Sequence, residues 1–379
     1  MVQRITEALP MDIQDLVTRQ LHQLNSIKIP CPIDAAAVSL EGDQYIAYMT
    51  VTQIIQAPNI RGKCFFITGP GGTGKSYLLK ALQYWCDSSR NPYLLLTPTG
   101  IAARNIAGNT IHSALSIYSK AAAYKTGIFR FSEAKREELK ALTTLIIDEV
   151  SMVDAELLDY ISSLFHRLKG NHLPFGGLKI IAFGDLLQLP PVQGQKVWNA
   201  VVWPLFHPIF LRQPRRQRDR HFFNVLNKVR FGIVDDEVRQ LFTERWQRHD
   251  PTANMWMSTY LCALRDEAKA LNTIALQGLP GHGETKLFEA EDFENDEPLI
   301  NTSTSQIFRK GTNFPNNVTC IVGAKVMFLT NGMLNNKGVA NGSLGVITNL
   351  LENGNIEAAF PTQNGIEVRY KSSPVIYLY

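Results

Sequence analysis

The sequence predicts an α/β fold built on a mainly parallel sheet. Short apolar runs without polar alternation recur in the first half of the chain, as expected of parallel strands covered on both faces. They lie at residues 64–67, 93–96, 145–147 and 179–183. Between the last two runs, apolar residues at helical spacing from Leu157 to Leu168 predict an amphipathic helix. Strands that alternate with helices are typical of a parallel α/β sheet.

A glycine-rich loop follows the first apolar run. Residues 69–76 read GPGGTGKS and match the pattern G-x-x-x-x-G-K-[ST] between a strand and a helix. Glycines there let the backbone turn its N–H groups toward nucleotide phosphates, and the helix N-terminus adds positive potential. We expect Lys75 to reach the β/γ-phosphates and Ser76 to bind Mg²⁺. The predicted nucleotide-binding loop residues are Gly69, Gly71, Gly72, Thr73, Gly74, Lys75 and Ser76. The alternative interpretation is a glycine-rich turn that binds nothing.

Polar residues follow two of the later strands. Asp148 and Glu149 come directly after the run 145–147, about 70 residues beyond the loop. At the carboxyl edge of the sheet, Asp148 is expected to hold Mg²⁺, and Glu149 to polarise a water for attack on the γ-phosphate. In the segment FGDLLQLPPV at 183–192, Gln188 is suited to hydrogen-bond the γ-phosphate. The alternatives are a solvated acidic pair and a plain turn whose prolines end a strand.

Composition narrows the class of protein. Of 379 residues, 45% are hydrophobic and 19% are charged, which is ordinary for a globular protein. No apolar run approaches the ~20 residues needed to span a bilayer, so we expect no membrane partner. The first 30 residues resemble neither a secretory signal nor a transit peptide. The five widely spaced cysteines argue against a disulfide framework or a zinc site and favour a reducing compartment.

Positive charge is concentrated in one segment. The whole chain has a formal net charge of +4, whereas residues 209–232 alone carry +6. A local basic stretch on a near-neutral chain suits an anionic ligand such as a phosphate or a nucleic acid. A charged face that is merely solvated is the alternative interpretation.

The pattern along the chain predicts several parts. Residues 1–43 form a weakly patterned lead-in. A first domain is expected at 44–208, with an inserted basic and aromatic subdomain at 113–142. A second domain is expected at 209–345, followed by a small β unit at 346–379.

Local signals support these divisions. A cluster of prolines marks the boundary between the two domains: Pro204, Pro208 and Pro214. In the second domain, residues 260–263 are predicted as a strand and 266–276 as a helix. The pairs Asn353-Gly354 and Asn364-Gly365 are hairpin-turn signals, and they predict antiparallel strands near the C-terminal end of the sequence.

Three motifs together carry a family resemblance. This chain resembles the PIF-type (petite integration frequency) DNA helicases of superfamily 1 through the motifs GPGGTGKS, IIDEVSM and GDLLQLPPV, which occur in the same order and spacing. The helicase carried by Helitron transposons is a close match to this chain. The resemblance covers about residues 40–350 and includes further blocks at 97–112, 215–232 and 322–347. It implies a P-loop NTPase with two RecA-like domains.

The resemblance also implies roles for single residues. Gln44 matches the glutamine that contacts adenine, and the alternative is a solvated glutamine. Arg216 matches the arginine that reaches the γ-phosphate from the second domain, although an alternative alignment gives this role to Arg212. The positions that match contacts to the single-stranded DNA backbone are Thr97, Thr99, Gly100 and His112. Asn272 and Asn331 match family positions to which we assign no role.

The implied function is that of an ATP-dependent DNA helicase that uses ATP and Mg²⁺. It would move 5′ to 3′ on single-stranded DNA and unwind duplex junctions, with roles in DNA repair, recombination or telomere maintenance in the nucleus. RNA is an alternative substrate, because backbone tracking without a 2′-OH contact discriminates sugars weakly. The sequence leaves open which proteins, if any, are its partners.

The chain departs from the family pattern at one end. The T-x-H-K-x-Q-G segment and the final arginine motif do not occur before Tyr379, so we expect the second RecA-like domain to be incomplete. The alternative functions are a truncated, inactive nucleotide- and DNA-binding remnant of a transposon helicase and, with less support, a small-molecule kinase that uses the same loop.

Overall fold

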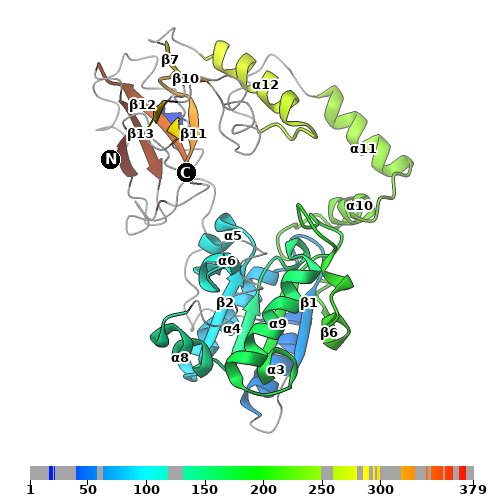
Figure 1. Cartoon of the computed structure of the whole chain (residues 1–379). Helices are drawn as coiled ribbons and strands as arrows, with labels where there is room; N and C mark the ends of the chain where they lie inside the picture. The colour runs from blue at the N-terminus through cyan, green and yellow to red at the C-terminus, as the bar shows by residue number, and fades with distance from the viewer. Residues whose placement is uncertain are drawn as a thin grey trace. The chain divides into compact units, whose positions relative to one another are not determined.

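The chain forms two compact units. The computed structural model describes residues 17–19, 21, 40–57, 63–117, 131–248, 259–279, 285–289, 293–294, 297–298, 317–328, 339, 343–352, 355–361 and 367–372. One unit comprises Pro30–His249, and the other combines Met1–Ile29 with Asp250–Tyr379 (Figure 1). Each unit is described by itself below.

A six-stranded parallel sheet forms the centre of the Pro30–His249 unit. Its strand order is β3-β2-β4-β5-β1-β6. The strands are β1 (Cys64–Thr68), β2 (Tyr93–Thr97), β3 (Asn109–Thr110), β4 (Thr144–Ile147), β5 (Lys179–Gly184) and β6 (Phe206–Phe210). The parallel α/β class and the four strands predicted from apolar runs are therefore confirmed.

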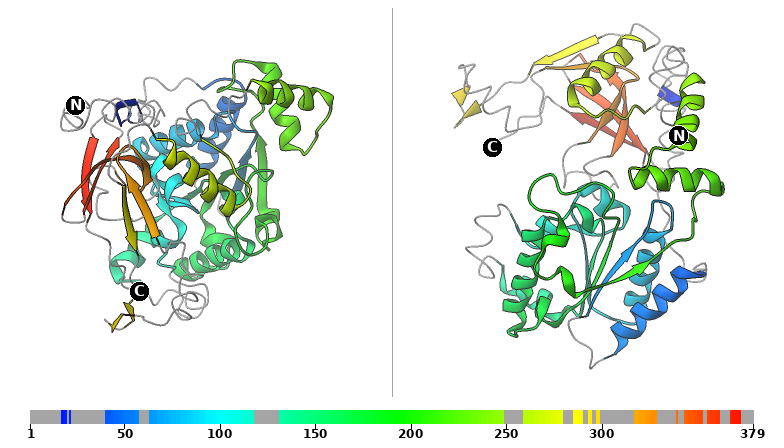
Figure 2. Two further views of the ribbon diagram at one scale, coloured as in Figure 1. Left: turned by 90° about the horizontal axis from the view of Figure 1, so that it is seen from above. Right: turned by 90° about the vertical axis from the view of Figure 1, so that its right-hand side faces the viewer.

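Helices cover both faces of this sheet. On one face, α9 (Ala155–Lys169) packs against side chains such as Phe66 and Ile180. On the other, α3 (Asp43–Gln56) and α4 (Lys75–Ser88) pack against their neighbours Phe65 and Ile181. The right-hand view of Figure 2 shows helices on the two sides of the strands. Because both faces are buried, the strands carry no polar alternation.

The helix predicted between residues 157 and 168 is α9. The Asp154 side chain accepts a hydrogen bond of 3.1 Å from the Leu157 N–H and so caps the first turn. Gly170 ends the helix in the left-handed region, with φ of 61°. Buried apolar residues between these caps repeat at helical spacing, as the sequence predicts.

The domain boundary predicted near residue 208 lies inside β6. This strand pairs with β1 along its length, and α10 (Arg220–Arg230) and α11 (Asp236–Gln247) belong to the same compact unit, which extends to His249. Pro208 is tolerated because β6 is at the edge of the sheet, where one side of a strand needs no partner. Pro208 therefore accompanies an edge strand of the parallel sheet.

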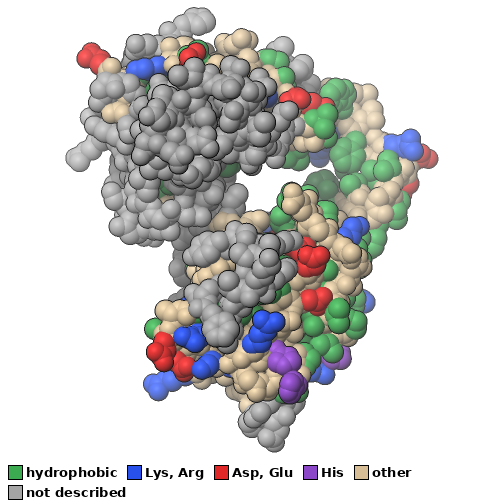
Figure 3. Space-filling model, in the orientation of Figure 1, with side chains coloured by type: hydrophobic (Ala, Val, Ile, Leu, Met, Phe, Trp, Pro, Cys, Tyr) green, Lys and Arg blue, Asp and Glu red, His purple; other side chains and the backbone are tan. Residues whose placement is uncertain are grey.

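The predicted insertion at 113–142 is described in part. Its described helix is α8 (Glu133–Ala141), which Ser132 caps and which buries Leu139 in the core. The outer side of α8 mixes both charge signs (Figure 3), with ion pairs of 2.8 Å between Lys135 and Glu138 and between Lys140 and Glu137. The basic positions Lys120, Lys125 and Arg130 lie outside the described residues.

The second unit is mainly antiparallel. Its four-stranded sheet has the order β11-β12-β13-β14, made by β11 (Lys325–Met327), β12 (Leu344–Leu350), β13 (Ile356–Pro361) and β14 (Glu367–Ser372). This confirms antiparallel strands in the 346–379 region. The turn pairs at 353–354 and 364–365 lie outside the described residues.

Other elements complete the second unit. A strand pair joins β7 (Thr285–Glu289) to β10 (Asn317–Ile321), and a short pair joins β8 (Phe293–Glu294) to β9 (Glu297–Pro298). The helix predicted at 266–276 is α12 (Arg265–Gln277). Residues 260–263 were predicted as a strand, but this prediction is wrong: they form no strand, and Leu261 is 97% exposed. Among the described residues no strand pairs with this apolar run, and a strand needs a partner.

The predicted lead-in contributes to the core of the second unit. Val17 and Leu21 are fully buried and form a cluster with Val346 and Ala359. Residues from the two ends of the sequence therefore share one hydrophobic core. The further division of the chain into 44–208, 209–345 and 346–379 remains a prediction.

Two further observations concern the whole described chain. Four of the cysteines fall in the described ranges, and each is a free thiol: Cys64, Cys86, Cys262 and Cys320. No helix among the described residues combines the length and apolar character needed to cross a bilayer.

Candidate nucleotide-binding site

The glycine-rich loop joins β1 to α4 at the carboxyl edge of the parallel sheet. Gly72 and Gly74 have φ angles of 86° and 84°, which side chains rarely adopt. A Cβ atom on Gly74 would lie 2.1 Å from the Gln44 amide nitrogen. The Thr73 hydroxyl closes the turn by donating to the Pro70 carbonyl at 2.9 Å. The backbone conformation therefore favours glycine at position 74, and a Cβ there would also displace the Gln44 amide.

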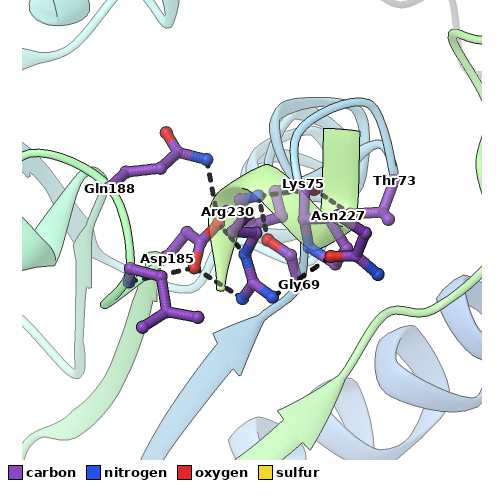
Figure 4. Close-up of polar contacts among 9 residues, drawn as sticks. Gly69, Thr73, Lys75, Asp185, Gln188, Asn227 and Arg230 are labelled. Atoms are coloured by element: carbon purple, nitrogen blue, oxygen red, sulfur yellow. Dashed lines mark hydrogen bonds and ion pairs between the residues drawn. The ribbon is translucent and has the colours of Figure 1, made fainter. Parts of the chain in front are cut away.

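Lys75 points back across the loop. Its Nζ donates to the carbonyls of Gly69 at 2.7 Å and Pro70 at 3.1 Å (Figure 4). Burial lowers the pKa of Lys75, while the nearby carboxylates, Asp185 first, act in the opposite direction. The next residue, Ser76, is exposed in the first turn of α4. A cation and a hydroxyl thus flank the N-terminus of one helix.

The predicted carboxylates follow β4. Asp148 is 6% exposed, and its Oδ1 accepts the Glu149 N–H at 3.0 Å. Burial raises the pKa of Asp148 to about 6, with the Glu149 charge adding to the effect and Lys75 opposing it. Glu149 has a φ angle of 51°, an unusual conformation for a residue with a side chain. Two carboxyl groups therefore lie near Lys75.

A third carboxylate, Asp185, follows β5 and binds two other polar side chains. Gln188 Nε2 donates to Asp185 Oδ2 at 3.0 Å. Arg230, the last residue of α10, donates from Nε to Oδ2 at 2.7 Å and from a terminal nitrogen to Oδ1 at 2.6 Å (Figure 4). Burial raises the pKa of Asp185, but hydrogen bonds, chiefly from Arg230, outweigh it and hold this pKa below its usual value.

The structure reveals Asp185 and Arg230 as site residues that the sequence interpretation missed. Both lie in segments that the family resemblance covers, residues 184–192 and 215–232, but their contact joins positions 45 residues apart. Local spacing carries no signal for such a pair. The sequence offered two weak hints: an acidic residue three positions before Gln188, and an arginine at the end of a predicted amphipathic helix.

Gln44 lies against the loop from α3. Only 3% of its surface is exposed, which excludes a solvated glutamine. Its Nε2 donates to the carbonyls of Thr73 at 3.1 Å and Gly74 at 3.3 Å. A cavity of about 340 Å³ opens beside these atoms. Its lining residues are Glu41, Gln44, Gly72, Gly74, Tyr77, Arg215 and Arg216.

The two candidate arginines take different positions. The backbone N–H of Arg216 donates to the Gly72 carbonyl at 3.0 Å, so Arg216 lies directly beside the loop. The backbone N–H of Arg212 donates to Asp43 at 2.5 Å, and Arg212 lines a second cavity of about 650 Å³. Both arginines belong to the same compact unit as the loop.

The predicted DNA-contact residues follow β2 and β3. Thr99 caps α5 (Gly100–Asn105) by accepting the Ala102 N–H at 3.3 Å, and Gly100 begins that helix. His112 is exposed in α6 (Ile111–Ala114). Thr97 differs because it is fully buried at the end of β2. Its role in DNA binding remains a prediction.

Two family positions remain. Asn272 is in α12 of the other compact unit. Asn331 lies outside the described residues. The site is therefore assembled within Pro30–His249, where β1, β4 and β5 are adjacent and deliver their following residues to one edge.

The comparisons with known proteins agree with this geometry. Residues 39–240 match the model of the PIF1-like helicase family, and this range contains the whole site. The chain belongs to the PIF1-like helicase family. The more specific likeness to Helitron helicases remains a prediction.

A curated relative of this chain is also a PIF1 helicase. The chain is 32% identical over 327 residues to the ATP-dependent DNA helicase PIF1 of Xenopus laevis, covering 82% of this chain and 48% of the frog protein. The chain thus spans about half the length of that curated relative.

Two similar structures are Pif1 helicases. A Pif1 studied at forked double-stranded DNA has a TM-score of 0.65 and 28% identity, covering 88% of this chain and 76% of its own. A Bacteroides Pif1 in complex with ADP-AlF3 and single-stranded DNA has a TM-score of 0.64 and 28% identity, covering 85% and 73%. The RecA-like P-loop fold predicted for this chain is confirmed.

Proposed function

We propose that this protein is an ATP-dependent DNA helicase, in which ATP hydrolysis drives movement along single-stranded DNA and the unwinding of duplex junctions. The observation that supports it best is the convergence at one sheet edge of Lys75, the Asp148–Glu149 carboxylates and Gln188. This set of groups suits phosphoryl transfer to water.

Phosphate binding would use the loop between β1 and α4. The Lys75 ammonium now donates to two loop carbonyls, and phosphate oxygens are stronger acceptors because they carry charge. The backbone N–H groups at the start of α4 favour an anion at the same place. Gln44, fixed by the carbonyls of Thr73 and Gly74, is placed to contact adenine in the adjoining cavity.

Magnesium fits the donors at this edge. Asp148 and Ser76 offer oxygen ligands, the type that Mg²⁺ prefers. In the described part of the chain, no group of three or more His, Cys, Asp or Glu residues could hold a metal ion. Mg²⁺ usually needs only one or two carboxylates together with substrate phosphates, so this donor set suffices. When bound, the ion would neutralise charge on the phosphates.

The remaining groups would act at the γ-phosphate. Glu149 would accept a proton from the attacking water, and Gln188 would donate a hydrogen bond to a phosphate oxygen. Arg216, anchored to Gly72 by its backbone, would compensate the negative charge that develops during transfer. Arg212 remains the alternative for this role.

DNA binding would use the loops beyond β2 and β3. Thr99, Gly100 and His112 start or occupy short helices there. Thr99 and Gly100 are partly exposed and His112 is exposed, which suits contacts to a DNA backbone. Related Pif1 proteins bind single-stranded DNA or act at forked DNA, which supports DNA over RNA. The 5′-to-3′ direction, nuclear location and roles in repair, recombination or telomere maintenance rest on the family alone.

The test is ATP hydrolysis by the full chain with and without single-stranded DNA. We expect single-stranded DNA to stimulate hydrolysis. Added salt should weaken this stimulation, because protein contacts to DNA phosphates release counterions and DNA binding therefore becomes weaker as salt rises. Lys75→Ala and Glu149→Gln should remove hydrolysis. Nucleotide and DNA binding without any hydrolysis would instead identify an inactive remnant, and hydrolysis retained by both variants would refute the assigned chemistry.

A further inference from the structure

The ion pair between Asp185 and Arg230 joins two elements of the proposed ATP site. Asp185 follows β5 and is 1% exposed, and Arg230 ends α10. Its two hydrogen bonds, of 2.7 and 2.6 Å, engage both carboxylate oxygens (Figure 4). Two charge-assisted bonds fix the orientation of the guanidinium group as well as its distance. The pair therefore ties the C-terminal end of α10 to the loop after β5.

The same carboxylate holds Gln188. One N–H of the Gln188 amide donates to Asp185 Oδ2 at 3.0 Å, and the Gln188 backbone N–H donates to the Asp185 carbonyl at 2.9 Å. An amide nitrogen carries two donor hydrogens, so the second can serve a phosphate oxygen while the first is held. The direction in which the second N–H of the Gln188 amide points therefore depends on the position of the Asp185 carboxylate.

Helix α10 is thus attached to the site on both sides. Before the helix, the backbone N–H groups of Arg215 and Arg216 donate to the Gly72 carbonyl at 2.7 and 3.0 Å. At its last residue, Arg230 binds Asp185. One helix therefore connects the glycine-rich loop with the residue expected to contact the γ-phosphate.

We propose that Arg230 is a positioning residue that, through Asp185, orients Gln188 toward the γ-phosphate and transmits the presence of that phosphate to α10. The proposal rests on the ATP-binding function proposed above. ADP lacks the γ-phosphate and does not engage Gln188. The network should therefore distinguish triphosphate from diphosphate without changing the affinity for the groups that both nucleotides share.

Arg230 is a suitable residue to replace. Together with Asp185 it lines the cavity of about 650 Å³, and Arg230 keeps part of its surface exposed, with 18% of the side chain accessible. Truncation enlarges an existing hollow and leaves the packed core of the sheet intact. The exposed Arg245 on α11 offers a matched control of the same residue type.

The experiment compares wild type with Arg230→Ala, Arg230→Lys and Arg245→Ala in the full chain. Affinity is measured for MgADP, for a non-hydrolysable MgATP analogue and for ADP with aluminium fluoride. We expect Arg230→Ala to weaken the last two about tenfold and to change ADP affinity less than about twofold. Arg230→Lys should recover only part of the loss, because lysine cannot form the paired contact. Arg245→Ala should match wild type.

Hydrogen exchange of residues 220–230 supplies a readout of the coupling. In wild type, the triphosphate analogue should slow exchange in α10 more than ADP does, and Arg230→Ala should remove this difference. The steady-state constants should change in kcat more than in KM. If Arg230→Ala does not fold, Arg230→Lys provides the same comparison.

Three results would overturn the proposal. In one, Arg230→Ala folds and distinguishes triphosphate from ADP as wild type does, which leaves the proposed ATP-binding function standing. In another, the variant weakens all nucleotides equally and lowers the melting temperature, which indicates a merely structural ion pair. In the third, wild type binds no nucleotide, and the proposed function fails together with this inference.

Discussion

The glycine-rich loop and helix α10 hold their positions by different means. The loop is closed by its own backbone and neighbours: Lys75 and Thr73 donate to loop carbonyls, and Gln44 braces it from α3. Helix α10 buries two of its apolar residues, Phe223 and Val225, and is otherwise attached to the site by polar contacts at its ends. Its other apolar residues Phe222 and Val229 are each 39% exposed.

This difference separates a rigid part of the site from a responsive part. A loop that is satisfied internally keeps its shape whether or not a ligand is present, which is the requirement for a preorganised phosphate site. A helix held by few contacts can shift when one of them changes, because regions with few buried contacts open at low free-energy cost.

The largest effect is expected at Lys75. Lys75→Ala removes the cation from the loop and should reduce ATP hydrolysis by roughly 10³-fold or more. The fold should survive, since Lys75 bonds only to carbonyls at the edge of the sheet. Steady-state hydrolysis and a thermal melt of the same sample check both statements. A variant that hydrolyses ATP like wild type would contradict the role of the loop.

A somewhat smaller effect is expected at Glu149. Glu149→Gln retains the shape of the side chain and removes the base, so kcat should fall by about 10²–10³-fold. Affinity for nucleotide should stay within about threefold of wild type, because Gln is neutral and similar in size. Parallel measurements of turnover and of nucleotide titration separate the two. Equal losses in both would argue for a binding role.

Gly74→Ala tests the packing of the rigid part. The added Cβ would lie 2.1 Å from the Gln44 amide nitrogen, and the backbone has φ of 84°. Strain of this kind costs about 1–3 kcal/mol, so the unfolding free energy should fall by that amount. Urea denaturation measures it, with Gly71→Ala as control because a Cβ there meets nothing within 4 Å. Equal unfolding free energies for the two variants would show that the loop can adopt another conformation at little cost.

The smallest effect concerns pH and the α10 contact. Hydrogen bonds, chiefly from Arg230, hold the Asp185 pKa below its usual value against the effect of burial, so the pair stabilises the fold above about pH 4 and loses this contribution as pH falls through the lowered pKa. Arg230→Ala removes the largest effect that lowers the Asp185 pKa, so we expect this pKa to be higher in the variant than in wild type. The stability deficit of this variant should therefore be largest near pH 7 and shrink below about pH 4. Urea unfolding at several pH values checks this, and a deficit independent of pH would contradict it.

Much of the first unit follows from local sequence. Apolar runs without alternation predict buried parallel strands, and the loop motif predicts its own geometry because its conformation depends on contiguous glycines. The order of strand, loop and helix then places Lys75 and Asp148 at the same edge, since the carboxyl ends of parallel strands lie together. The predicted phosphate-site residues of this edge are therefore close in space.

Other features were decided by contacts between distant residues. Pro208 suggested a domain boundary, but the pairing of β6 with β1 makes it part of the sheet edge. The run 260–263 looked like a strand and lacks a partner among the described residues. The burial of Thr97 could not be predicted from the sequence either, because it depends on which residues pack around the end of β2.

The sequence by itself determined the parallel α/β sheet, the glycine-rich loop and the carboxylates that face it, because each depends on residues adjacent in the chain or on one shared sheet edge. Only the tertiary structure decided that Arg230 forms an ion pair with Asp185 and that residues 209–249 belong to the first compact unit. Such contacts depend on side chains brought together over long sequence separations, and no local periodicity records them.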